Sequence, residues 1–206
     1  MNMQQMVQIS RQKEPKSPNP KPNKTGVRKR NRNDPLTKAE VELLLSKVDS
    51  LMEHTLLLFG FSSGVRVGEA VGFGIEAINE QEGYVHIWDE KKNRYRDVYI
   101  TAGVIAKLKM YWNERGDRKS PKFFNISTKT AERIIQRWTE KVLLKRKSWH
   151  CVRHTYITLS QESEIPISIV IENTGDKPST ILEYYTKLSP TFKRDQIQKK
   201  PLFHVQ

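Results

Sequence analysis

The sequence predicts one mainly helical α+β domain with a small antiparallel three-stranded sheet, flanked by two tails. Three observations predict this class. Apolar residues recur with helical spacing on both sides of residues 74–100, that stretch alternates with a period of two, and no internal repeat is found. A chain of 206 residues also has room for one domain of ordinary size.

Residues 1–33 are expected to form a basic arm without stable structure. Residues 1–34 contain nine Lys or Arg and two acids, a charge of +7 out of the +13 of the chain, and offer little to bury. The arm either lies on phosphates, which we favour, or is a solubilising tail. The arm residues that we expect to bind DNA are Arg28, Lys29, Arg30 and Arg32.

The folded domain is expected to span residues 34–190 and to open with two helices. Thr37 followed by Glu40 has the spacing of a capping box at the start of the first. The apolar stripe of that helix consists of Val41, Leu44, Leu45 and Val48. A more apolar helix follows through residues 50–64.

The pattern changes in residues 74–100. The alternating positions are Tyr84, Val85, His86, Ile87 and Trp88, followed after a charged turn by Val98 and Ile100. Alternation of this kind is typical of strands, so we expect about three antiparallel strands here.

Helical signals return after the sheet and continue to the end of the domain. The segments are residues 101–116, 127–148, 148–163, 165–175 and 177–188, with Thr101 and Ser148 as candidate N-caps. Residues 191–206 form a C-terminal tail, which either docks on a neighbouring protomer or packs on its own domain.

The amino-acid composition limits the classes of partner, site and compartment that fit this chain. Lys and Arg total 36 against 23 Asp and Glu, so a polyanionic partner is favoured over a merely solvated basic surface. The one cysteine, Cys151, excludes a disulfide framework and a four-cysteine zinc site. The N-terminus has no apolar signal region and no run reaches the length of a membrane span, so we expect an intracellular protein, cytoplasmic and associated with the nucleoid.

Three motifs far apart in sequence carry chemistry. Arg66 stands two residues after Gly64, and Glu69 follows it by three. The second motif places His150, Arg153 and His154 on one predicted helix. The third runs from Gly175 to the adjacent tyrosines Tyr184 and Tyr185.

In this order, the motifs resemble those of the tyrosine recombinase (phage-type integrase) family, over about residues 34–190. The resemblance implies the fold of that family's catalytic domain, with catalytic residues Arg66, Lys91, His150, Arg153 and Tyr185 and supporting residues Glu69 and His154. It implies double-stranded DNA as the partner, a homo-oligomer (dimer or tetramer) on that DNA, no membrane, no metal and no other cofactor. On the hairpin we expect Lys92, Arg94 and Arg96 to face phosphate.

The nucleophile is chosen by counting. In the family the tyrosine comes ten residues after the glycine and is usually followed by threonine; here these positions are Tyr185 and Thr186, counted from Gly175. Neighbouring residues of a helix differ by about 100° in direction, so we expect Tyr184 to pack instead.

The residue types suit transfer of a DNA strand. Attack on a phosphodiester adds negative charge to its non-bridging oxygens, and the planar forks of Arg66 and Arg153 can hold two such oxygens without titrating. A tyrosine nucleophile conserves the energy of the broken strand in a covalent bond. The resemblance implies that His150 is the base and Lys91 the acid.

Two features depart from the family. A histidine or tryptophan normally follows the glycine, whereas this chain has Asp176 and then Lys177, so the fifth phosphate donor is missing, replaced by Lys177, or supplied by a shifted loop. Where the family usually has a separate helical DNA-binding domain, the arm stands here.

The expected function is therefore that of a site-specific recombinase or integrase of a mobile element, virus or small genome, working through a 3′-phosphotyrosyl intermediate. Two alternatives stay open. One is a catalytically weak or inactive DNA-binding regulator or accessory protein of the same fold, which Asp176 favours, and the other is a type IB topoisomerase-like enzyme that relaxes DNA.

Overall fold

The computed structural model describes residues 33–116, 119–186 and 190–199. The helices are α1 (Lys38–Lys47), α2 (Leu51–Ser63), α3 (Val67–Gly72), α4 (Ala102–Glu114), α5 (Thr128–Leu143), α6 (Trp149–Glu162), α7 (Ile167–Thr174), α8 (Pro178–Thr186) and α9 (Pro190–Lys199), with a 3₁₀ turn at Ile75–Ala77. The strands are β1 (Ile78–Asn79), β2 (Tyr84–Asp89) and β3 (Arg94–Tyr99). The predicted class, mainly helical with one small antiparallel sheet, is confirmed. Within these ranges, every helix is too short or too polar to cross a membrane.

The capping box predicted at the start of the first helix is found. Thr37 caps α1, and its hydroxyl accepts a hydrogen bond from the Glu40 N–H at 3.2 Å. The Glu40 carboxylate accepts in return from the Thr37 N–H at 3.0 Å. Two N–H groups that the helix itself cannot satisfy are thereby paired.

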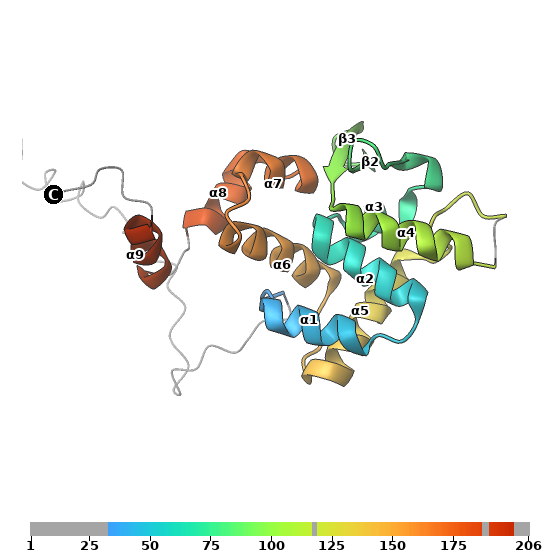
Figure 1. Ribbon diagram of the computed structural model, residues 1–206, viewed down its shortest axis with the longest axis horizontal. Coiled ribbons are helices and arrows are strands. Elements are labelled where there is room, and N and C mark those ends of the chain that lie inside the picture. Colours follow the sequence, from blue (N-terminus) through green and yellow to red (C-terminus); the bar gives the residue numbers. More distant parts are fainter. Residues whose placement is uncertain (1–32, 117–118, 187–189, 200–206) are drawn as a thin grey trace, which may run out of the picture. The chain divides into compact units, whose positions relative to one another are not determined.

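Helix α2 runs through the core, in contact with α1, α4, α5 and α6 (Figure 1). Its Leu56, Leu57 and Phe59 are fully buried, which explains why this segment is apolar on most sides. Burial of each such side chain stabilises the fold by about 1.5–3 kcal/mol. Helix α2 ends at Gly64, whose φ of 67° is the left-handed conformation that glycine adopts without strain.

The sheet has the order β1-β2-β3, with antiparallel pairs throughout. Val85 and Ile87 of β2 are buried, while His86 and Trp88 are exposed, as the alternation predicts. The same inward phase continues to Asp89, which is 1% exposed. A carboxylate buried to this degree needs cationic partners, and they belong to the site described below.

A second apolar cluster holds the last two helices of the domain against α6. It consists of Tyr156, Ile157, Val170 and Ile181, with Tyr184 packed against it. Figure 1 shows α7 and α8 beside α6, and residue contacts join all three pairs of these helices. The orientation of α8 relative to α6 is therefore set by packing.

The residues that precede α1 are hydrogen-bonded to the start and the middle of α6. The Asn33 carbonyl accepts a hydrogen bond from His154 Nδ1 at 2.9 Å, and its side-chain oxygen accepts from the Ser148 hydroxyl at 2.6 Å. The Leu36 N–H donates to the Thr155 hydroxyl at 2.9 Å. The chain thus enters the domain at the helix that carries the second motif.

Candidate active site

Arg66 is placed by the turn that joins α2 to α3. Its N–H donates to Glu69 Oε2 at 2.7 Å, and its Nη1 donates to Glu69 Oε1 at 2.9 Å. The three-residue spacing of the first motif therefore lets one carboxylate hold both the backbone and the side chain of Arg66. The Arg66 side chain is 30% exposed, so it can reach a ligand.

Glu69 also holds Arg96 of β3. Nη1 and Nη2 of Arg96 donate to the two Glu69 oxygens at 3.0 and 2.8 Å, and both side chains are 6% exposed. Arg96 further donates to the carbonyls of Glu172 and Asn173 at 3.1 Å each. The expectation that Arg96 faces phosphate needs correction, because its donors are used inside the protein to join β3, α3 and α7.

Asp89 is the site residue that the motifs did not indicate. Its Oδ1 lies 3.5 Å from Arg66 Nη1, and its Oδ2 lies 3.7 Å from Arg96 Nη1. The strand pattern could have indicated Asp89. Side chains of a strand alternate in direction, so Asp89, two residues after Ile87, is a charged residue at an inward-facing position. Three carboxylates, from Glu69, Asp89 and Asp176, thus surround Arg66.

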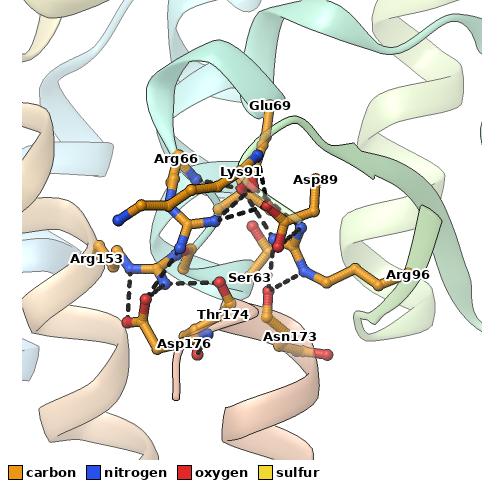
Figure 2. Close-up of polar contacts among 12 residues, drawn as sticks. Ser63, Arg66, Glu69, Asp89, Lys91, Arg96, Arg153, Asn173, Thr174 and Asp176 are labelled. Atoms are coloured by element: carbon orange, nitrogen blue, oxygen red, sulfur yellow. Dashed lines mark hydrogen bonds and ion pairs between the residues drawn. The ribbon is translucent and has the colours of Figure 1, made fainter. Parts of the chain in front are cut away.

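Lys91 lies in the β2–β3 turn and is exposed. Its N–H donates to Asp89 Oδ1 at 3.1 Å, the same oxygen that lies nearest Arg66. Figure 2 draws Lys91 together with the arginines of the site. The structure thus connects the predicted lysine turn to Arg66. Lys92 and Arg94 are exposed on the same hairpin.

Arg153 of α6 is buried, with its side chain 5% exposed. Its Nη1 donates to the Gly64 carbonyl at 2.7 Å and its Nη2 to the Thr174 carbonyl at 2.6 Å. These bonds fix the guanidinium between the end of α2 and the end of α7. The second motif thereby meets the first.

Asp176 contacts both arginines of the site (Figure 2). Its Oδ1 is 3.0 Å from Arg66 Nη2 and 2.6 Å from Arg153 Nη2, and its Oδ2 accepts from Arg153 Nε at 3.3 Å. Lys177, the next residue, is exposed. The residue that departs from the family is therefore a direct partner of both arginines.

Both arginines remain charged near neutral pH. Burial lowers the pKa of Arg153, and Asp176 opposes that shift. Burial also acts to lower the pKa of Arg66, but Glu69, Asp176 and Asp89 outweigh it, so that the pKa is raised. The site therefore presents two permanent cations.

His150 and His154 lie one turn apart on α6, with ring centroids 4.1 Å apart. His150 is exposed, whereas His154 is half-buried and bonded to Asn33. Burial, followed by the neighbouring His150, lowers the pKa of His154. Across the described residues, no three His, Cys, Asp or Glu side chains gather to hold a metal ion.

The two tyrosines lie in α8. The Tyr184 hydroxyl is 2.7 Å from His154 Nε2, and burial, with a smaller effect of Asp176, raises its pKa. Tyr185 belongs to the same helix, but its side chain is outside the described part of the structure. The arm residues expected to bind DNA, Arg28, Lys29, Arg30 and Arg32, also lie outside the described residues.

The sequence model of the phage integrase family matches residues 34–191. The chain belongs to the phage integrase family. This match includes all three motifs, from Arg66 to Tyr185. The predicted resemblance is confirmed.

Proteins similar in sequence to this chain include named tyrosine recombinases. The tyrosine recombinases XerA of Pyrococcus horikoshii and Pyrococcus furiosus are each 26% identical to it, over 82% and 81% of this chain. The chain spans 62% of the length of each of these relatives.

Solved structures share the fold. A crystal structure of XerA recombinase matches with a TM-score of 0.71 at 23% identity, covering 82% of this chain and 66% of that one. The XerH site-specific recombinase bound to its difH substrate matches with a TM-score of 0.66 at 20% identity, covering 81% and 54%.

Proposed function

We propose that this chain breaks and rejoins DNA strands as a site-specific tyrosine recombinase. One observation carries the proposal: Nη2 of Arg66 and Nη2 of Arg153 converge on the same oxygen of Asp176, at 3.0 and 2.6 Å. Two guanidinium groups that share one anionic oxygen are spaced to share an oxygen of a phosphate. The names of the XerA relatives and the binding of XerH to its difH substrate support DNA as the source of that phosphate.

The proposed reaction transfers a DNA strand to Tyr185. The phenol oxygen attacks phosphorus, the bond from phosphorus to the 5′ oxygen breaks, and a 3′-phosphotyrosine forms. His150 takes the phenol proton, and Lys91 gives a proton to the departing 5′ oxygen. Attack by a 5′ hydroxyl on the phosphotyrosine reverses the step, so no other energy source is required.

The two arginines stabilise the charge that develops on the non-bridging oxygens. Arg153 is held by the Gly64 and Thr174 carbonyls, and Arg66 by Glu69, so both are oriented before the substrate arrives. Removal of one preorganised donor of this kind costs about 10² to 10³ in rate. A lysine in place of Arg153 would lose the planar fork, and we expect a loss in that range.

Partners and setting follow from the reaction. Exchange of strands between two duplexes needs a nucleophile on each, so we propose that at least two copies act together on DNA. The net charge of +13 favours association with a polyanion inside the cell. The family description, phage integrase, supports a mobile element or virus as the source of the exchanged DNA.

Covalent trapping tests the proposal. A pool of duplexes of random sequence, each nicked so that the short fragment bearing the new 5′ hydroxyl escapes after cleavage, is incubated with protein, and DNA that remains on denatured protein is sequenced. We expect adducts with the unaltered chain and with Tyr184→Phe, and none with Tyr185→Phe. Adducts that persist in Tyr185→Phe and vanish in Tyr184→Phe would identify Tyr184 as the nucleophile.

Two other functions give different results. An inactive DNA-binding regulator, favoured by the carboxylate of Asp176 in the site, would retain duplex binding and form no adduct with any trapped sequence. A topoisomerase-like enzyme would form adducts and relax supercoiled plasmid without joining two duplexes. Joined products from two labelled duplexes would support the recombinase.

A further inference from the structure

The α7–α8 turn places an anion where the proposed function requires a phosphate. Asp176 follows Gly175, the left-handed residue that ends α7. A side chain at Gly175 would meet Asp89 Oδ2 at 2.7 Å and Arg96 at 3.1 Å, so the backbone of the turn approaches the arginine site closely. The Asp176 carboxylate therefore starts from a fixed position beside Arg66 and Arg153.

The carboxylate uses the donors that a phosphate would need. Arg153 directs one N–H of Nη1 and one N–H of Nη2 at carbonyls, and it directs Nε and Nη2 at Asp176. Arg66 likewise turns Nη1 to Glu69 and Nη2 to Asp176. A phosphate that approached this pair would meet a like charge and occupied donors.

We propose that Asp176 is an internal occupant of the arginine anion site, which a substrate phosphate must displace before the arginines can bind it. The inference rests on the proposed function, since that function supplies the phosphate. In the absence of DNA the carboxylate neutralises two neighbouring guanidinium groups. Asp176 thereby lowers affinity for any phosphate that does not bring enough further contacts to displace it, which makes it a specificity-determining residue.

A merely structural role for Asp176 predicts something different. Arg153 is buried, and an unpaired buried cation is costly, so Asp176→Asn should lower the melting temperature under either view. The two views differ when phosphate is added. An internal occupant, once neutralised, leaves a vacant anion site that phosphate fills, whereas loss of a structural ion pair creates no affinity for phosphate.

The experiment measures binding of inorganic phosphate to the full chain by titration calorimetry and by the rise in melting temperature. Ionic strength is held constant with sodium chloride. Asp176→Asn and Asp176→His should bind phosphate about tenfold or more tightly than the unaltered chain, because charged hydrogen bonds become available. Asp97→Asn, which removes a half-exposed carboxylate bonded to His86, is the matched control and should behave like the unaltered chain.

The site of any gain is checked with a double variant. Arg66→Gln combined with Asp176→Asn should lose the gain in phosphate affinity. Unchanged phosphate affinity in both single variants, or a gain that survives Arg66→Gln, would overturn the inference. If neither single variant folds in phosphate-free buffer, each is refolded in phosphate buffer. Recovery of the folded protein would support a vacant anion site, and failure to recover it would overturn the inference.

Covalent trapping separates this inference from the proposed function. Adducts with the unaltered chain, without a phosphate gain in the Asp176 variants, would leave the recombinase proposal intact and reject the internal occupant. A phosphate gain without adducts from any variant would reject the recombinase and keep the anion site. If both hold, Asp176→His should form adducts about tenfold faster than the unaltered chain at limiting DNA.

Discussion

The hydroxyl of Tyr184 lies 2.7 Å from Nε2 of His154, and Nδ1 of the same ring lies 2.9 Å from the Asn33 carbonyl. A carbonyl can only accept, so Nδ1 carries the proton and the neutral Nε2 accepts from the tyrosine. Tyr184 also packs against the cluster that joins α6, α7 and α8, as the sequence predicts. The ring of His154 therefore connects the entry of the chain to the helix that carries Tyr185.

The His154 contacts predict a loss of stability in mild acid. Burial, His150 and Arg153 lower its pKa more than Asn33 and Asp176 raise it, so the folded protein binds the His154 proton less readily than the unfolded chain does. The stabilisation is complete above the unfolded pKa of about 6.5 and is lost as pH falls through the lower folded value. Urea denaturation between pH 7.5 and 5.5 should show the free energy of unfolding falling.

A variant isolates the contribution of His154. His154→Gln keeps a polar side chain without this titration, so its free energy of unfolding should fall less over the same range. His54, whose pKa is lowered by burial and by Lys107, contributes in the same direction. His54→Gln should therefore remove a separate part of the pH dependence of the free energy of unfolding. An identical pH profile for His154→Gln and the unaltered chain would contradict the assignment.

Glu69 should be among the most costly carboxylates to remove. It is 6% exposed in its side chain and pairs with Arg66 and with the equally buried Arg96. Glu69→Gln leaves Arg96 with a weaker partner in a buried site, and we expect a loss of about 3–5 kcal/mol in the free energy of unfolding. Urea denaturation measures it. Glu42→Gln, whose exposed ion pair with Lys38 spans 4.0 Å, should cost less than about 1 kcal/mol.

Local patterns were sufficient to predict most of the fold. Apolar spacing and caps such as Thr37 predicted the helices, and alternation from Tyr84 to Trp88 predicted the sheet, because these signals depend on neighbours in sequence. The convergence of Arg66 with Arg153 was expected through the family resemblance, and the structure brings both onto Asp176.

The polar network could not be predicted in the same way. Arg96 stands in a hairpin rich in exposed charge, and its burial depends on Glu69 and on carbonyls of α7 that lie 76 and 77 residues away. The partners of Asp176 depend on the placement of α2 and α6 beside the α7–α8 turn. Such contacts are set by packing between distant segments, on which local spacing carries no information.

Two glycines near Arg66 should respond in opposite ways to alanine. Gly64 has a φ of 67°, and an added Cβ would lie 2.3 Å from the Tyr156 ring, so Gly64→Ala should cost at least about 1–2 kcal/mol. Gly68 lies in α3, where an added Cβ would meet nothing within 4 Å beyond its chain neighbours and the backbone of its own helix, so Gly68→Ala should stabilise by up to about 1 kcal/mol. Thermal denaturation of the two variants tests this prediction, and equal shifts in their melting temperatures would contradict the backbone argument.

The basic arm should determine much of the salt dependence of DNA binding. Residues 1–32 contain nine Lys or Arg, and the arm joins the domain at Asn33, whose carbonyl is bonded to the second-motif helix α6. Each phosphate contact steepens the log–log dependence of duplex affinity on salt by about 0.9. Deleting residues 1–32 should therefore flatten that slope by several times this amount, measured by fluorescence anisotropy with one duplex.

A matched variant distinguishes charge from chain length in that experiment. An arm of unchanged length with its nine Lys and Arg replaced by Ser should flatten the slope as much as the deletion does, because counterion release depends on charge. Lys92→Gln with Arg94→Gln removes two exposed hairpin charges and should lower the slope by at most about 1.8, since it removes at most two contacts. A slope that the Ser arm leaves unchanged would mean that the arm serves solubility, and that the phosphate contacts come from the folded domain.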